Sequence, residues 1–75
     1  DMGWSDVGSW SALHQETAQD NAGNTILGDV MALDTENTYV RSEKQLTAVI
    51  GMKNAIVVVT PDAVLVADKA HDQAV

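Results

Sequence analysis

The residues of this chain that could take part in chemistry are concentrated in residues 3–10, which read Gly-Trp-Ser-Asp-Val-Gly-Ser-Trp. This stretch holds both tryptophans, two of the five glycines and one carboxylate, Asp6. A carboxylate oxygen is a hard ligand, and nucleotide-bound Mg²⁺ usually takes one or two of them. In front of a helix the same side chain would instead cap the turn, near the positive helix N-terminus. The residue types alone leave both roles of Asp6 open.

The other residues with reactive or ligating side chains do not form a known catalytic arrangement. His14 and Glu16 stand two positions apart on an expected helix and therefore point in different directions. Ser9 or Ser11 beside His14 lacks the G-x-S-x-G turn of a nucleophilic serine. The chain has no cysteine, and its second histidine, His71, is far from the first in sequence. Disulfides and thiolate zinc sites are excluded, and no metal cage is expected.

The charge of the chain is acidic and unevenly distributed. The net charge is −7; residues 1–40 hold seven acidic residues and no lysine or arginine, whereas residues 41–75 hold four of each sign. Nucleic-acid backbones and anionic membranes attract basic faces, so we expect neither as a partner. An acidic half suits a divalent cation or simply keeps the chain soluble. Without a basic, apolar leader or a run of about 18 apolar residues, the sequence predicts a cytoplasmic location.

The length of 75 residues allows one small domain. A core of this size rarely supplies more than about 3–5 kcal/mol, and small domains often add disulfides or a structural metal. Because neither is expected here, we expect the chain to be stabilised by contacts with a neighbour, either another copy or a further part of the same polypeptide. The sequence also begins with Asp1 and opens directly on its densest motif, which indicates a piece of a longer protein.

The first 24 residues predict one helix. Ser9 is a suitable N-cap, and Trp10, Leu13 and Thr17 share one face at helical spacing, so we expect a helix over 9–19. The turn residues 20–24 should end it, with Gly23-Asn24 as the helix C-terminal turn.

The remainder of the chain predicts short strands. Runs rich in Val, Ile, Leu and Thr alternate with turn residues, and residues 56–59 are apolar on both faces, as in a strand covered on two sides. Short strands without intervening helices suit a small sandwich, a partial barrel or a β-helix, and the spacing does not decide among them. The expected strands cover residues 25–27, 29–33, 38–41, 46–50, 55–60 and 63–67.

Beyond residues 4–10, the chain carries further short motifs that recur in one enzyme family. They are Ala12-Leu13, Asp20, Gly23-Asn24, Gly28-Asp29-Val30, Asn37 to Ser42, Ala48 to Gly51 and Val58 to Ala63. Together with Trp4-Ser5-Asp6-Val7-Gly8-Ser9-Trp10, they closely resemble the bacterial mannose-1-phosphate guanylyltransferases. These nucleotidyltransferases join mannose 1-phosphate to GTP and give GDP-mannose and pyrophosphate. The resemblance covers essentially the whole chain, and the first ten residues are its specific part.

The resemblance implies a mainly β fold, with a short N-terminal helix followed by a small left-handed β-helix-like set of short strands. Residues 1–24 would end the nucleotidyltransferase domain and carry its metal loop and docking helix. Residues 25–75 would form the β-helix-like segment through which such enzymes associate. The family thus favours the β-helix over the sandwich. In many members a phosphomannose isomerase domain of the cupin type follows.

The resemblance also implies roles for particular residues. Asp6 matches the second metal-binding aspartate, which holds Mg²⁺ against the phosphates together with an aspartate from earlier in the catalytic domain. Trp4, Gly8 and Trp10 match the frame that fixes this loop. The family's glycine-rich phosphate loop, first metal aspartate and sugar-binding region are absent from the sequence, as is the zinc site of the isomerase. We therefore expect the chain alone to be inert, with Mg²⁺, GTP and mannose 1-phosphate bound only by the intact enzyme.

Two kinds of partner follow from these expectations. One is the catalytic domain of the parent protein. The other is a further copy of the chain, packed through an N-terminal helix that would leave Trp4, Trp10 and Leu13 uncovered. The alternative to a guanylyltransferase segment is a free-standing, non-catalytic module for oligomerisation or interaction. A small β-domain whose resemblance to the family is accidental is a third interpretation.

Overall fold

The computed structural model describes residues 6–70, which form one helix followed by six strands. Among these residues no helix is long and apolar enough to cross a membrane. All six strands lie within two residues of the positions expected from the sequence. The elements are α1 (Val7–Glu16), β1 (Thr25–Leu27), β2 (Val30–Leu33), β3 (Tyr39–Ser42), β4 (Thr47–Ile50), β5 (Ala55–Val59) and β6 (Val64–Asp68).

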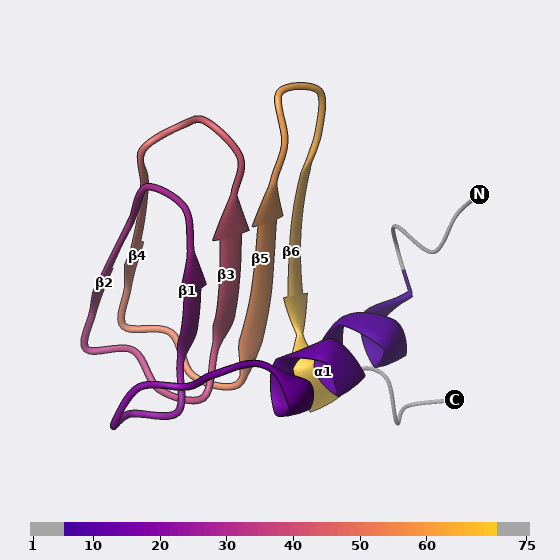
Figure 1. Cartoon of the computed structure of the whole chain (residues 1–75), viewed down its shortest axis with the longest axis vertical. Helices are drawn as coiled ribbons and strands as arrows, with labels where there is room; N and C mark the ends of the chain where they lie inside the picture. The colour runs from indigo at the N-terminus through magenta and orange to yellow at the C-terminus, as the bar shows by residue number, and fades with distance from the viewer. Residues whose placement is uncertain (1–5, 71–75) are drawn as a thin grey trace.

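The strands wind into a β-helix-like coil, as the resemblance implied. The chain passes alternately between a four-stranded sheet, in the order β1-β3-β5-β6, and a two-stranded sheet of β2 and β4 (Figure 1). Pairing is parallel up to β5, whereas β6 folds back antiparallel to β5 and ends the coil. A sandwich is thereby excluded, and the left-handed sense of the winding stays a prediction.

The repeat of the coil is about 17 residues. Tyr39 pairs with Ile56 and Val30 pairs with Thr47, both 17 positions apart, whereas Thr25 pairs with Tyr39 after 14. A 17-residue turn is not a multiple of the six-residue repeat typical of β-helices, so the spacing of aliphatic residues alone did not single out this fold.

The corners of the coil need a left-handed backbone, and Gly, Asn and Asp residues occupy them. Gly23, Asn37 and Asn54 have φ values of 81°, 51° and 56° and recur at the spacing of successive turns. Asn37 Nδ2 donates to Asn54 Oδ1 at 2.7 Å, so one corner is bonded to the next. Glycine and asparagine adopt this conformation more readily than other residues. Their positions in the sequence therefore mark where the chain turns.

Strand β5 is buried on both faces, as predicted, and it separates two apolar clusters. Between the sheets, Val57 and Val59 pack with Val40 and Val49. On the opposite face, Tyr39, Ile56 and Val58 pack under Val7 and Trp10 of α1. Fully burying one such side chain contributes about 1.5–3 kcal/mol. The two clusters together are the main source of stability in the chain.

Helix α1 begins and ends earlier than the sequence predicts. It covers Val7–Glu16, and Thr17 is its extended C-cap. The carbonyl of His14 accepts hydrogen bonds from Thr17 Oγ1 at 3.1 Å and from Gln19 Nε2 at 3.0 Å. Because these side chains satisfy the helix end, the turn at residues 20–24 is a separate structure. The expectation that Gly23-Asn24 is the helix C-terminal turn is therefore wrong.

Candidate functional site

Asp6 lies at the start of α1 and caps it. Its Oδ1 accepts a hydrogen bond from the backbone N–H of Ser9 at 3.4 Å, and its Oδ2 accepts one from Ser9 Oγ at 2.9 Å. The expectation that Ser9 is the N-cap is wrong, because Ser9 supplies the donors. The Asp6 carboxylate is exposed. An ionised carboxylate has about four lone-pair sites, so the cap leaves oxygen sites available to a further ligand.

The described residues can supply one ligand of a magnesium site, but they do not form a complete site. Within residues 6–70 no group of three or more His, Cys, Asp or Glu side chains is placed to hold a metal. Asp6 offers one exposed carboxylate. Mg²⁺ in nucleotide sites keeps several waters and takes one or two carboxylates plus phosphate oxygens. Metal binding by Asp6 stays a prediction that requires groups beyond this chain.

The predicted frame around Asp6 is placed in part. Gly8 lies in the first turn of α1. Trp10 is half-buried against Tyr39 of β3, with ring centroids 5.8 Å apart. Trp4 lies outside the described residues. The expectation that the helix leaves Trp10 uncovered is wrong, because Trp10 packs on the chain's own sheet. The expectation for Leu13 is confirmed, since its side chain is exposed.

His14 is a buried polar residue whose role the sequence reasoning missed. Val7, Trp10 and His14 make the buried face of α1, whereas the sequence favoured Trp10, Leu13 and Thr17. The imidazole is fully buried, with Nε2 at 2.9 Å from the carbonyl oxygen of Gly23 and Nδ1 at 2.7 Å from Lys69 Nζ. The steps of three and four residues from Val7 were the signal for this face.

The environment of His14 favours its neutral form. Burial lowers the pKa of His14 below 6.5, the nearby positive charge of Lys69 lowers it further, and the hydrogen bond with Gly23 opposes them. At neutral pH the imidazole is therefore an uncharged structural contact.

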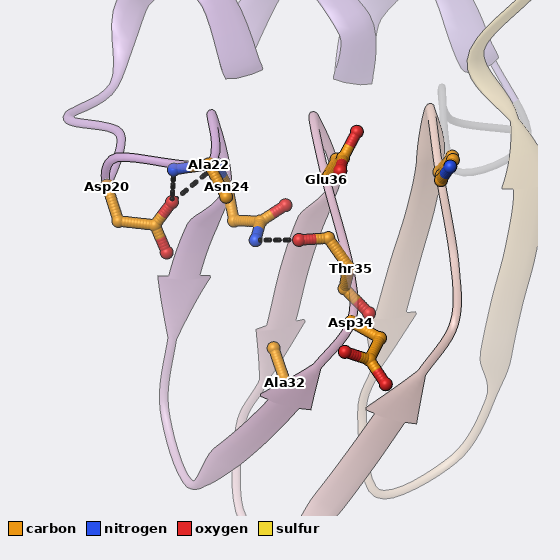
Figure 2. A pocket seen from close by; sticks show the side chains of 8 residues that line it. Asp20, Ala22, Asn24, Ala32, Asp34, Thr35 and Glu36 are labelled. Carbon is orange, nitrogen blue, oxygen red and sulfur yellow. Dashed lines mark hydrogen bonds between the residues drawn. The ribbon is translucent and has the colours of Figure 1, made fainter.

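A polar cleft of about 520 Å³ opens beside the first corner of the coil. It is lined by Asp20, Asp34, Glu36 and Lys53, among other residues. Figure 2 shows the three carboxylates pointing apart, and Oδ1 of Asp20 accepts hydrogen bonds from two backbone N–H groups at 2.9 Å. The Asp20 carboxylate is thus bonded within its own turn, and the three carboxylates do not converge on one point.

Asn24, at the wall of this cleft, holds two turns of the coil together. It is buried, and its Nδ2 donates to the carbonyl oxygen of Thr35 at 2.7 Å (Figure 2). Its Oδ1 accepts from the N–H of Thr38 at 2.9 Å. Buried backbone groups must find such partners. Gly23-Asn24 is thus a structural motif of the coil, which explains a family motif without assigning it a role in catalysis.

An apolar groove of about 390 Å³ lies where the coil stops. After β5 the chain folds back, and β6 joins the four-stranded sheet. Within residues 6–70, no third strand therefore lies beside β4 in the two-stranded sheet. Ile50, Val64 and Val66 are consequently exposed by 60–64%. We call this groove the open groove; it is lined by Thr47, Ala48, Val49, Ile50, Met52, Val57, Val59, Val64 and Val66. All nine residues that line it are uncharged.

Comparison with known proteins supports the resemblance. The chain is 51% identical over 69 residues to the mannose-1-phosphate guanylyltransferase ManC of Salmonella typhimurium, covering 92% of this chain and 14% of that protein. It is 48% identical over all 75 residues to the xanthan biosynthesis protein XanB of Xanthomonas campestris, covering 16% of it. The chain therefore spans about one sixth of these relatives or less.

A solved structure agrees with these relatives. A protein of Thermus thermophilus, described as a mannose-1-phosphate geranyltransferase, superposes with a TM-score of 0.72 at 32% identity, over 85% of this chain and 20% of that one. A family model described as the MannoseP isomerase/GMP-like beta-helix domain matches residues 28–75. Since this match covers more than half of the chain, the protein belongs to the family of MannoseP isomerase/GMP-like β-helix domains.

Proposed function

We propose that this chain is a segment of a mannose-1-phosphate guanylyltransferase that carries a metal-binding aspartate and mediates association. The observation that supports the proposal is that Asp6 lies at the start of a helix that packs directly on the coil. Asp6 caps α1, and α1 packs through Trp10 on the same sheet that contains the buried strand β5. A carboxylate at the end of a packed helix is held in a fixed place, which a metal ligand needs.

The proposed reaction is attack of a phosphate oxygen of mannose 1-phosphate on the α-phosphorus of GTP, with release of pyrophosphate. Bound Mg²⁺ would supply neutralisation of the phosphate charge. Phosphoryl-group chemistry of this kind depends mainly on positioning and electrostatic stabilisation. The part of this chain is to present the Asp6 carboxylate while the cap to Ser9 keeps its orientation.

Because one carboxylate cannot position two substrates, we expect the 75-residue chain alone to form no GDP-mannose from GTP, mannose 1-phosphate and Mg²⁺. The polypeptide that contains it should form GDP-mannose under the same conditions. Chromatographic detection of GDP-mannose distinguishes the two. Turnover by the chain alone would contradict the proposal. Absence of turnover by the intact polypeptide would favour the free-standing interaction module.

We place the association surface at the open groove, with a second copy of the chain as its occupant. The groove has no charged lining, so two chains with a net charge of −7 meet there without like-charge contacts. Isologous contacts around a two-fold axis pair identical patches, and the outer edge of β4 is available for strand pairing with its symmetry mate. Trp10 is half-buried against its own sheet, so only Leu13 of the predicted helix contact is exposed within residues 6–70, which argues against α1 as the main contact.

Light scattering tests this surface with two matched variants. Val66 lies in the open groove and Leu46 does not, although the two are similarly exposed, at 60% and 66%. We expect a dimer that dissociates in Val66→Glu, because the new charges would be buried at the interface. Leu46→Glu should remain a dimer. A wild-type monomer at high concentration, or equal loss in both variants, would contradict the placement.

A further inference from the structure

His14 connects α1 to three other parts of the fold. Its Nε2 contacts the Gly23 carbonyl, in the loop before β1, and its Nδ1 contacts Lys69 Nζ, just after β6. The same ammonium group donates to Oδ1 of Asn37, in the loop before β3, at 3.2 Å. One fully buried imidazole therefore joins the helix to both ends of the coil.

The hydrogen-bond partners of the imidazole determine which ring nitrogen carries its proton. A carbonyl oxygen can only accept a hydrogen bond, so Nε2 must carry a hydrogen and donate it to the Gly23 carbonyl. An ammonium group can only donate, so Nδ1 must be unprotonated and accept the hydrogen bond from Lys69 Nζ. A second proton would be placed on Nδ1, facing the ammonium group. It would remove the hydrogen bond and set two positive charges side by side.

Among residues 6–70, no neighbouring group of the imidazole compensates for that second proton. From β3 the imidazole faces the ring of Tyr39, with centroids 6.0 Å apart, and the Tyr39 hydroxyl has no hydrogen-bond partner in this part of the chain. From the loop before β1 it meets the Gly23 carbonyl, and from the segment after β6 the charged Lys69. Glu16, on α1 itself, is two positions from His14 and points elsewhere. No carboxylate of the described residues bonds to the imidazole.

We propose that His14 and Lys69 are positioning residues that lock α1 onto the sheet in a clamp that operates only while the imidazole is neutral. Acidification then loosens α1 together with the Asp6 cap at its start. The partly buried apolar side chains packed against the inner cluster of Val40, Val49, Val57 and Val59 are Ile26, Val30 and Met52, none of them in α1, so the coil itself persists. The consequence for Asp6 rests on the proposed function, whereas the clamp does not.

We call α1 docked when it is packed on the sheet. The direction of the pH effect follows from the lowered pKa of His14 in the docked state. An undocked imidazole has an ordinary pKa of about 6.5 and binds a proton more readily than the docked one. Docking is therefore fully favoured above about pH 6.5. It weakens by up to about tenfold per pH unit below that value, until the docked imidazole itself titrates.

Nuclear magnetic resonance of the whole chain tests the clamp as the solution is acidified from mildly alkaline to mildly acidic pH. We use a His71→Gln background, so that His14 gives the single imidazole signal. The expected result is an Nε2–H tautomer at alkaline pH, then a change of the Trp10 indole signal that follows the titration of His14. The methyl signals of Val57 and Val59 should stay unchanged. No GTP, sugar or Mg²⁺ is present, so failure here is distinguishable from failure of the proposed function.

Two variants separate the clamp from a merely structural role. His14→Gln places an amide donor and an amide acceptor on one non-titrating side chain, so Trp10 should become independent of pH in this range. Lys69→Met removes both the hydrogen bond to Nδ1 and the repulsion on the imidazolium, so the titration of His14 should move to higher pH and acidification should change the Trp10 signal less than in the parent. If His14→Gln does not fold, the shift in Lys69→Met decides. An unshifted transition in Lys69→Met, or a Trp10 transition that persists in His14→Gln, would overturn the proposal.

Discussion

Replacing Gly28 with alanine is expected to unfold most of the chain. Gly28 has a φ of 97°, and a Cβ built there would overlap the carbonyl oxygen of Ser42 in β3. The left-handed backbone costs a residue with a Cβ about 1–2 kcal/mol. Overpacking against the backbone adds about 1–3 kcal/mol. The sum is comparable to the roughly 3–5 kcal/mol that a core of this size supplies.

Gly51→Ala is the matched control for this substitution. Gly51 also has a positive φ, of 72°, but a Cβ there would meet no atom within 4 Å. It should therefore lose only the backbone contribution of about 1–2 kcal/mol. Urea unfolding followed by circular dichroism compares the two free energies of unfolding. If Gly28→Ala lost no more stability than Gly51→Ala, the close approach of Gly28 to β3 would be wrong.

The strands could be predicted because local chemistry specifies them. Runs of Val, Ile and Thr between Gly, Asn and Asp corners mark where each strand begins and ends. The corners Asn37 and Asn54 adopt the left-handed backbone that their residue types favour. What the spacing could not show is which strands pair. That pairing depends on the 17-residue turn of the coil, and it took the family resemblance to favour a β-helix.

The contacts around α1 could not be predicted because they depend on distant residues. The end of the helix is an exception, because it is set locally by Thr17 and Gln19, whose side chains donate to the carbonyl of His14. His14 itself contacts Lys69, 55 positions further along the chain. No local pattern reports such a contact. The capping role of Asp6, in contrast, was predictable. It was one of the two roles, helix cap or metal ligand, that the sequence left open for this carboxylate.

Asp6→Asn separates the capping role of Asp6 from its proposed role as a metal ligand. Asparagine is about as good an N-cap as aspartate, so α1 should keep its start. Loss of the negative charge at the helix N-terminus should lower stability by only about 0.3–1 kcal/mol. The carboxylate for Mg²⁺ is lost entirely. Removing one preorganised electrostatic contact from an active site commonly lowers turnover by roughly 10²–10³-fold.

The measurement that tests the account most directly is the rate of GDP-mannose formation by the intact polypeptide that contains this chain. It is compared between wild type and Asp6→Asn over a range of Mg²⁺ concentrations, with Asp20→Asn as the control, because Asp20 is bonded within its own turn. We predict a loss of about 10²-fold or more in Asp6→Asn, with a higher Mg²⁺ requirement and unchanged helix content, and near wild-type turnover in Asp20→Asn. Full turnover by Asp6→Asn at limiting Mg²⁺ would show that Asp6 is a helix cap and no more.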